Sequence, residues 1–214
     1  MKRKNLFKRY LCLLLGFTII AFGIAFSIKA DLGTSPVSSV PYVVSRLTPL
    51  TVGNVTILLH SFLILLQLIL LRRRFTLLHL LQLPAAIVFG YLTDFAIWVT
   101  AGLNPVGYPQ QLLCCAVGVV LVGLGVSLEF TANVLMLAAE GMSKTLAAVT
   151  GCKPGNAKVA VDSTLVVIAV VLSLVFLRRL SGVREGTVAA ALLVGTLSKF
   201  FQKLLKKPME KLLG

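Results

Sequence analysis

The chain has 214 residues, of which 57% are hydrophobic and only 13% are charged, and its mean hydropathy is +0.96. Soluble domains carry about 25% charged residues, so this composition excludes a soluble globular protein and leaves no room for a soluble domain of useful size. The formal net charge of +14 does not indicate nucleic-acid binding, because no basic segment carries interleaved aromatic residues or a binding motif.

The first apolar segment, residues 10–28, follows a basic N-terminus and approaches the roughly 20 residues that a membrane-spanning helix needs. Residues 1–30 imitate a cleavable signal peptide. Because residues 112–132 repeat this segment deep inside the chain, we expect a first span that is retained.

A polar segment rich in proline and glycine, residues 29–50, interrupts the apolar pattern. Pro36, Pro41 and Pro49 are expected to break any helix here, although Ser35 before Pro36 is typical of an N-cap and a first helical position. A helix N-terminus at membrane depth attracts anions. The segment therefore predicts substrate or ion contacts, and an ordinary surface loop with paired charges is the alternative. The candidate residues are Lys29, Asp31, Thr34, Ser35, Ser38 and Ser39.

Spans two and three are predicted over residues 54–71 and 77–100, with Arg72–Arg74 between them. His60 in span two is a candidate for proton coupling, because histidine changes its charge near neutral pH. A hydrogen-bonded packing residue is the alternative. In span three a small or polar face is predicted to be a helix contact, and it comprises His79, Gln82, Ala86, Gly90 and Thr93.

A polar link over residues 102–111 leads to span four, residues 112–130. Glu129 follows Gly118 and Gly125 at helical spacing, so it lies on the face where helices approach closely. A carboxylate on that face is not expected to point at lipid, and ionisable groups inside a membrane are candidates for function. Contact with water near the end of the span is the alternative.

The second broken segment covers residues 131–154, and Glu140 and Lys144 within it are spaced to pair on one helix face. A pair at the membrane surface is the alternative to a role in a substrate path. The candidates of this segment are Asn133, Glu140, Ser143 and Lys144.

Spans five and six are predicted over residues 156–177 and 186–201, followed by a basic tail, residues 202–214. Lys158 and Asp162 begin span five four residues apart and are expected to form a local ion pair. Asp162 is a further coupling candidate, because it corresponds to the histidine of span two in the repeat described next.

The two halves of the chain are copies of one another. At one constant spacing Cys12, Gly16, Gly23 and Ala30 correspond to Cys114, Gly118, Gly125 and Ala132. The predicted units are residues 1–101 and 112–201, each with three spans and one broken or re-entrant segment after its first span. Three is an odd number, so the second unit would be inverted in the membrane. The broken segments would enter from opposite faces, buried in protein or lining a watery cavity.

The distribution of cations predicts that both termini are cytoplasmic. With six spans, the Lys and Arg residues that fall outside are only Lys29, Arg46, Arg178, Arg179 and Arg184, out of 21 in the chain. If both broken segments spanned fully there would be eight helices, and Arg72–Arg74 would be external. That topology is the alternative.

The run from Gly23 to Tyr42 (GIAFSIKADLGTSPVSSVPY), with LQLP at residues 81–84 and FGYLTD at residues 89–94, resembles the YczE-like (YczE/YitT-type) family. Residues 30–41 are the most specific part, and the likeness covers nearly the whole chain. The family consists of largely uncharacterised bacterial integral membrane proteins, so the resemblance implies a multi-pass protein of the bacterial plasma membrane. Members are loosely associated with export or production of secondary metabolites, and the resemblance implies no catalytic residues.

Together these features predict a secondary transporter for a small molecule that the residues do not identify. A membrane scaffold that positions partner proteins without transport is the alternative. Enzyme motifs such as H-E-x-x-H, G-x-S-x-G and the P-loop are absent, and two histidines with four cysteines lacking C-x-x-C spacing predict no metal or cofactor. The lipid bilayer is the expected partner, and the oligomeric state is open, with a homodimer compatible.

Overall fold

The computed structural model describes residues 3–213, and this part of the chain is all helical. Six helices are long and apolar enough to cross a membrane, which confirms the predicted fold class. They are α1 (Arg3–Ala30), α3 (Val52–Leu71), α5 (Gln82–Val99), α6 (Tyr108–Ala132), α8 (Pro154–Leu172) and α9 (Glu185–Leu213).

Several helix bounds differ from the predicted spans. The third span was expected to begin at residue 77, but a separate turn α4 (Leu77–Leu80) precedes α5. Pro84 explains the break, because it has no N–H for the carbonyl of Leu80 and its ring crowds that carbonyl. The turn η1 (Arg72–Arg74) follows α3, and α8 continues into a π-helical turn η2 (Ser173–Leu177). The predicted basic tail continues α9 as far as residue 213, and residue 214 lies outside the described residues.

Two shorter helices, α2 (Pro36–Leu47) and α7 (Ala138–Thr150), occupy much of the two broken segments. The expectation that prolines exclude a helix from the first segment was wrong. Pro36 takes the first helical position, where no N–H is needed, and Ser35 takes the extended N-cap conformation as predicted. Pro41 lies inside α2 but is fully buried, so packing offsets its missing hydrogen bond.

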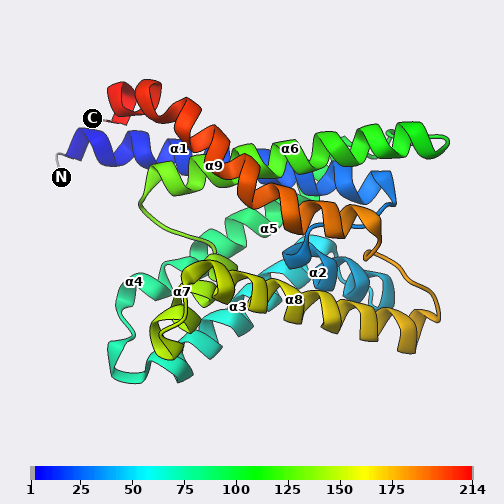
Figure 1. Cartoon of the computed structure of the whole chain (residues 1–214), viewed down its shortest axis with the longest axis horizontal. Coiled ribbons are helices and arrows are strands. Elements are labelled where there is room, and N and C mark those ends of the chain that lie inside the picture. The colour runs from blue at the N-terminus through cyan, green and yellow to red at the C-terminus, as the bar shows by residue number, and fades with distance from the viewer. Residues whose placement is uncertain (1–2, 214) are drawn as a thin grey trace.

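Both short helices turn back into the molecule (Figure 1). The chain leaves α1 at one end, returns through residues 31–35 toward the middle, and runs along α2 to the end where α3 begins. Residues 133–137 and α7 make the same excursion from the opposite end, where both termini lie. Here α2 packs against α3 and α8, while α7 packs against α8 and α3.

Helices α1 and α6 cross at four glycines. A Cβ built on Gly23 would lie 2.8 Å from the carbonyl oxygen of Gly118, and one built on Gly125 would lie 2.6 Å from that of Gly16. Because the earlier glycine of α1 meets the later glycine of α6, the two helices run antiparallel. Small residues allow such close approach within a membrane, where van der Waals packing drives helix association.

Helix α5 holds the start of α3 through Asp94. Its Oδ1 accepts a hydrogen bond of 2.7 Å from the Gly53 amide, and its Oδ2 accepts one of 2.6 Å from the Thr51 hydroxyl. Asp94 thus satisfies the open N-terminus of α3. Gly53 and Gly90 allow the two helix backbones to touch.

Site-directed labelling tests the arrangement of the spans. In a Cys152→Ser background, which leaves only the buried Cys12, Cys114 and Cys115, Arg73→Cys and Arg179→Cys are expected to react with a membrane-impermeant maleimide from opposite faces. The reason is that α3 and α8 end at opposite ends of the molecule (Figure 1). Labelling of both from the same face would contradict the topology.

A matched pair of glycine substitutions tests the α1–α6 crossing. Gly23→Ala is expected to lower the free energy of unfolding by about 1–3 kcal/mol, because the new methyl group would meet the α6 backbone. Gly195→Ala in α9 is the control, since no atom lies within 4 Å of a Cβ there. Alanine favours a helix over glycine by about 1 kcal/mol, so the control should be neutral or stabilised. Thermal unfolding in detergent measures both, and equal losses would contradict the crossing.

Candidate functional site

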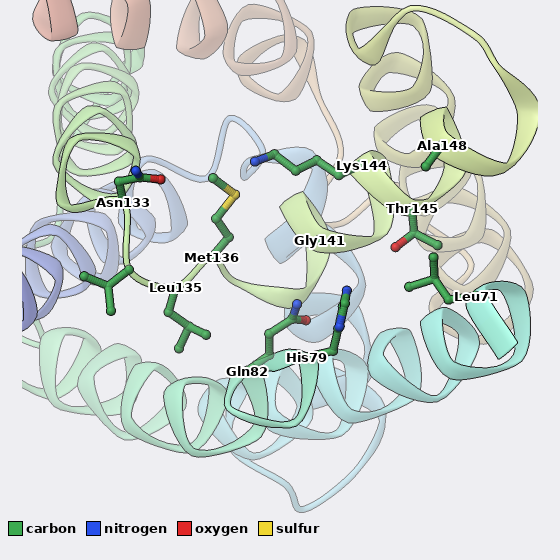
Figure 2. Close-up of a pocket in the computed structure, with 11 residues that line it drawn as sticks. Leu71, His79, Gln82, Asn133, Leu135, Met136, Gly141, Lys144, Thr145 and Ala148 are labelled. Atoms are coloured by element: carbon green, nitrogen blue, oxygen red, sulfur yellow. The ribbon is translucent and has the colours of Figure 1, made fainter. Parts of the chain in front are cut away.

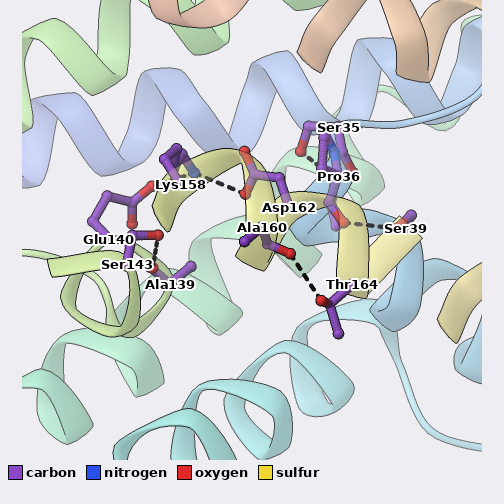
Figure 3. A network of polar contacts seen from close by, with 11 residues as sticks. Ser35, Pro36, Ser39, Ala139, Glu140, Ser143, Lys158, Ala160, Asp162 and Thr164 are labelled. Atoms are coloured by element: carbon purple, nitrogen blue, oxygen red, sulfur yellow. Dashed lines mark hydrogen bonds and ion pairs between the residues drawn. The ribbon is translucent and has the colours of Figure 1, made fainter. Parts of the chain in front are cut away.

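A cluster of charged side chains joins the second re-entrant helix to α8. Lys158 Nζ lies 3.0 Å from Asp162 Oδ1 and 3.5 Å from Glu140 Oε1 (Figure 3). The carboxylate-bearing side chains are only 12% and 16% exposed, for Glu140 and Asp162 respectively. The predicted ion pair between Lys158 and Asp162 is therefore present, and it extends across to α7.

Glu140 was expected to pair with Lys144 on one helix face, and this expectation was wrong. Among the described side chains, the cation nearest to its carboxylate is Lys158 of α8. Spacing within one helix predicted only a local pair, whereas the packing of α7 against α8 supplies a cation from another helix. Lys144 is exposed, and no ion pair of it is found among the described side chains.

Glu129 lies on α6 at the second break of the chain and is fully buried. Its Oε1 accepts a hydrogen bond of 2.7 Å from the backbone N–H of Leu137, the N-cap residue of α7. Its Oε2 has no hydrogen-bond partner among the described residues. The charges of Glu140, Lys158 and Lys144 lie within electrostatic range of Glu129. The alternative of a carboxylate that reaches water is thus excluded in this conformation.

His60 lies on α3 and is also fully buried. Within the described part of the chain, neither ring nitrogen has a hydrogen-bond partner, and the ring centroid lies 6.0 Å from that of Phe89. The hydrogen-bonded packing histidine considered above is therefore not what the structure contains. Glu140 is the charged group within electrostatic range of this imidazole, and α7 packs against both α3 and α8. The predicted coupling candidates thus lie around one re-entrant helix.

A pair of buried glutamines connects α3, α5 and α7. Gln67 Nε2 donates to the carbonyl oxygen of Ala138 at 3.1 Å and to Gln82 Oε1 at 3.1 Å. Gln82 Nε2 returns a hydrogen bond of 3.4 Å to Gln67 Oε1. A Cβ at Gly141 would lie 2.8 Å from the Gln82 amide nitrogen, so this glycine lets α7 approach the pair.

A cavity of about 370 Å³ opens beside the second break, between the α6–α7 connection, α7 and the start of α5 (Figure 2). Its lining residues are Leu71, His79, Gln82, Asn133, Val134, Leu135, Met136, Gly141, Lys144, Thr145 and Ala148. Of the predicted path residues, Asn133 and Lys144 therefore face a hollow. Ser143 instead donates to the carbonyl of Ala139 at 3.0 Å within α7.

The candidates of the first break lie away from this cavity. Lys29 donates to the Ala101 carbonyl at 3.1 Å, and the Asp31 side chain is exposed. Thr34 bonds to the Gly182 carbonyl through both its amide and its hydroxyl. The three serines satisfy one another or the carbonyls of α2, and they are Ser35, Ser38 and Ser39.

Segment 182–187 closes the first break. Besides the bonds to Thr34, the Gly186 amide donates to the Leu32 carbonyl at 2.8 Å and Arg184 donates to the Asp31 carbonyl at 2.9 Å. The polar backbone of residues 31–35 is thus covered, while residues 133–136 of the second break line the cavity.

Two features of the site were missed in the sequence analysis, the buried residue Gln67 and the cavity. Gln67 was not singled out, although a lone glutamine in an apolar span was a usable signal. Gln82 and His79 were assigned to a helix contact, which Gln82 makes, but the cavity they line was not foreseen. Among the described residues, no group of three His, Cys, Asp or Glu side chains gathers closely enough to hold a metal ion.

The chain belongs to a family of unknown function, DUF6198, whose model matches residues 7–203. Over 123 residues it is 32% identical to the uncharacterized protein YyaS of Bacillus subtilis (strain 168). That match covers 56% of this chain and 59% of the relative, so the chain is aligned with less than two thirds of that protein. No solved structure matches.

Removal of the shared lysine tests the charged cluster. Lys158→Met is expected to lower the free energy of unfolding by about 2 kcal/mol, because two partly buried carboxylates lose their common cation. Lys153→Met is the control, since Lys153 is exposed just before α8. The triple variant Glu140→Gln/Lys158→Met/Asp162→Asn should recover most of the loss. Chemical unfolding in detergent measures all three, and a control as unstable as Lys158→Met would contradict the role of the cluster.

Proposed function

We propose that the chain is a secondary transporter of a small molecule in the bacterial plasma membrane, and that Glu129 carries the coupling proton. One observation carries the proposal: a fully buried carboxyl group with one unpartnered oxygen holds the N-terminus of a re-entrant helix. An isolated charge away from water is costly, and ionisable groups inside a membrane protein mark substrate and proton paths. We therefore propose that this carboxyl group acts in transport and not in catalysis.

An inverted repeat is part of this proposal. It is supported by the antiparallel crossing of α1 and α6, in which Gly16 meets Gly125 and Gly23 meets Gly118. In the sequence, Gly16 corresponds to Gly118 and Gly23 to Gly125. A two-fold axis between the halves requires each glycine of α1 to contact the counterpart of the other one, and this is the observed pairing. The exchanged packing of α2 and α7 on α8 and α3 supports the same symmetry. Transporters built this way bind substrate at the repeat interface, beside discontinuous helices.

The two breaks are in different states, which supports alternating access. Residues 31–35 are hydrogen-bonded to segment 182–187, whereas residues 133–136 line the cavity. We propose that this conformation is open toward one face and closed toward the other. The distribution of Lys and Arg supports a cytoplasmic opening, because Arg72–Arg74 and both termini lie at the end where α7 enters.

Glu129 is placed to couple a proton to this movement. Its carboxylate accepts the hydrogen bond of the Leu137 amide at the start of α7. The same carboxylate interacts electrostatically with Glu140 and Lys158. Proton binding would weaken the hold on the helix and change the balance of charge around Lys158. His60 and Asp162 would share the proton path, since α7 packs on the helices that carry both.

The resemblance to the YczE-like family fits this assignment. It carries an association with export of secondary metabolites, so export is the direction that we propose. The scaffold alternative predicts a solid interior without a polar cavity, and the cavity beside α7 weighs against it.

Substitution of the buried carboxyl group tests the proposal. Glu129→Gln is expected to abolish proton-coupled flux, because glutamine can still accept the Leu137 hydrogen bond but cannot bind and release a proton. Proteoliposomes with entrapped pyranine would report proton flux on addition of a panel of organic anions, cations and neutral solutes. Glu185→Gln is the matched control, since this carboxylate is 48% exposed, its ion pair among the described residues is with the adjacent Arg184, and it makes none of the bonds that close residues 31–35.

Infrared difference spectra between acidic and alkaline samples add a readout that needs no substrate. A carboxyl band that titrates in the parent chain and in Glu185→Gln, but not in Glu129→Gln, is the expected result. Parent-like flux in Glu129→Gln, or no flux from the parent chain with the whole panel, would refute transport through this residue. A phenotype unaffected by Glu129→Gln would instead favour the scaffold.

A further inference from the structure

We infer that the cavity beside α7 binds small organic anions, in which one acidic group is joined to an apolar body. The assignment of such an anion as the transported substrate rests on the proposed function, whereas the binding site stands on the lining residues. None of the eleven residues that the structure describes around the cavity is acidic. The volume of about 370 Å³ lies within the range of small-molecule sites, about 300–1,000 Å³.

Lys144 supplies a cation to the cavity. Among the described side chains no carboxylate lies within ion-pair distance of it, because Glu140, its neighbour on the same helix, pairs with Lys158. Figure 2 shows the ammonium group reaching over the hollow from α7 toward Asn133. A lysine without an acidic partner, above a cavity without acids, is complementary to an anion.

His79 supplies a hydrogen-bond donor. Its Nδ1 lies 3.2 Å from the Thr76 amide nitrogen, 2.9 Å from the Thr76 hydroxyl and 3.2 Å from the Thr76 carbonyl oxygen. The amide can only donate and the hydroxyl can also donate, so an accepting Nδ1 satisfies two of these three contacts and leaves the proton of the neutral ring on Nε2. The ring stacks on Phe75, with centroids 4.9 Å apart, which fixes its plane. In Figure 2 the ring points into the hollow. An Nε2–H group held in this way donates to an acceptor, and it cannot accept from a donor.

Gln82 supplies a second donor of fixed orientation. The carbonyl of Ala138 can only accept, so it sets which end of Gln67 carries nitrogen, and Gln67 in turn sets the orientation of Gln82. One N–H of the Gln82 amide goes to Gln67 Oε1. Its second N–H has no partner among the described residues and belongs to the end of the side chain that faces the cavity (Figure 2).

The rest of the lining fits an apolar body. Besides Gly141 and the polar Asn133 and Thr145, it consists of five apolar side chains: Leu71, Val134, Leu135, Met136 and Ala148. Three donors around one cavity, together with the apolar part of its wall, favour a carboxylate, phosphate or sulfate group attached to a hydrocarbon or aromatic part. Glu129 lies within electrostatic range of Lys144, so a proton on Glu129 and an anion at Lys144 favour each other's binding.

Ligand-observed saturation-transfer NMR with protein in phosphatidylcholine nanodiscs tests the site. The probes are benzoate, phenyl phosphate and phenyl sulfate, with benzamide and benzylamine as neutral and cationic analogues of the same size. At least one anion is expected to bind more tightly than both analogues. Lys144→Gln should weaken it about tenfold, the loss of one charge-assisted hydrogen bond. Lys153→Gln is the matched control, an exposed lysine that does not line the cavity, and it should bind as the parent chain does.

A second variant guards against misfolding as the cause. Met136→Trp should fill the cavity and remove binding of the anion while the unfolding temperature stays near that of the parent chain. Nanodiscs with phosphatidylglycerol distinguish two sources of the same chemistry. Loss of probe binding there identifies a lipid headgroup as the natural occupant, and unchanged binding identifies a soluble anion.

Failure of all three anions to bind more tightly than benzamide and benzylamine, no binding of any anion at millimolar concentration, or unchanged binding in Lys144→Gln would each overturn the inference. These outcomes are separate from those of the flux experiment. Anion binding without flux would support the site and refute transport. Flux that depends on Glu129 but is unchanged in Lys144→Gln would support transport and refute the site as its substrate site.

Discussion

Backbone groups away from water need partners inside the protein, and this requirement governs how the two breaks of the chain are built. A helix satisfies its own N–H and C=O groups, but residues 31–35 and 133–137 do not belong to helices. At the first break the partner is other backbone, in segment 182–187. At the second break it is a carboxylate, because Glu129 accepts the Leu137 amide. The same need for a partner thus produces a sealed loop at one end and a charged, cavity-bordered loop at the other.

The halves of the chain share a pattern of residues but not of contacts. Gly53 and Gly90 bring α3 and α5 together, and Asp94 caps the start of α3. Gly155 follows Gly53 by 102 residues and Gly195 follows Gly90 by 105, and neither has a described atom within 4 Å of a built Cβ. At the same spacing of 105 residues, a cation, Lys199, takes the place of Asp94. A cation repels the positive N-terminus of a helix, so α9 cannot cap α8 in the way that α5 caps α3. Helices α3 and α5 are therefore tightly joined, whereas the described residues of α8 and α9 lack this close contact.

The sequence predicted the spans, the position of both breaks and the face on which Glu129 lies, because hydropathy and spacing are local. It did not predict which side chains meet across helices. Glu140 forms an ion pair with Lys158, because the packing of α7 against α8 brings these two side chains together. The helix over residues 36–47 was missed because a rule about proline ignores burial, which offsets the lost hydrogen bond at Pro41. The cavity was missed for a similar reason: His79 and Lys144 are distant in sequence, and only the fold brings them to one hollow.

The buried ionisable side chains lower the stability of the fold, and this suggests that they are present for a function and not for folding. Burying charges is expensive, and an ion pair replaced by apolar residues of similar volume is often as stable or more so. A chain that needed only to hold six spans together could use leucine and alanine where it has Glu129, His60, Glu140 and Asp162. A local requirement explains part of the role of Glu129, since the Leu137 amide needs a hydrogen-bond acceptor. A serine or an asparagine can accept that bond without an unpartnered oxygen, and neither ring nitrogen of His60 forms a hydrogen bond with a described residue. What distinguishes these groups from cheaper alternatives is that they can gain and lose protons, which is the property that a coupled transporter uses.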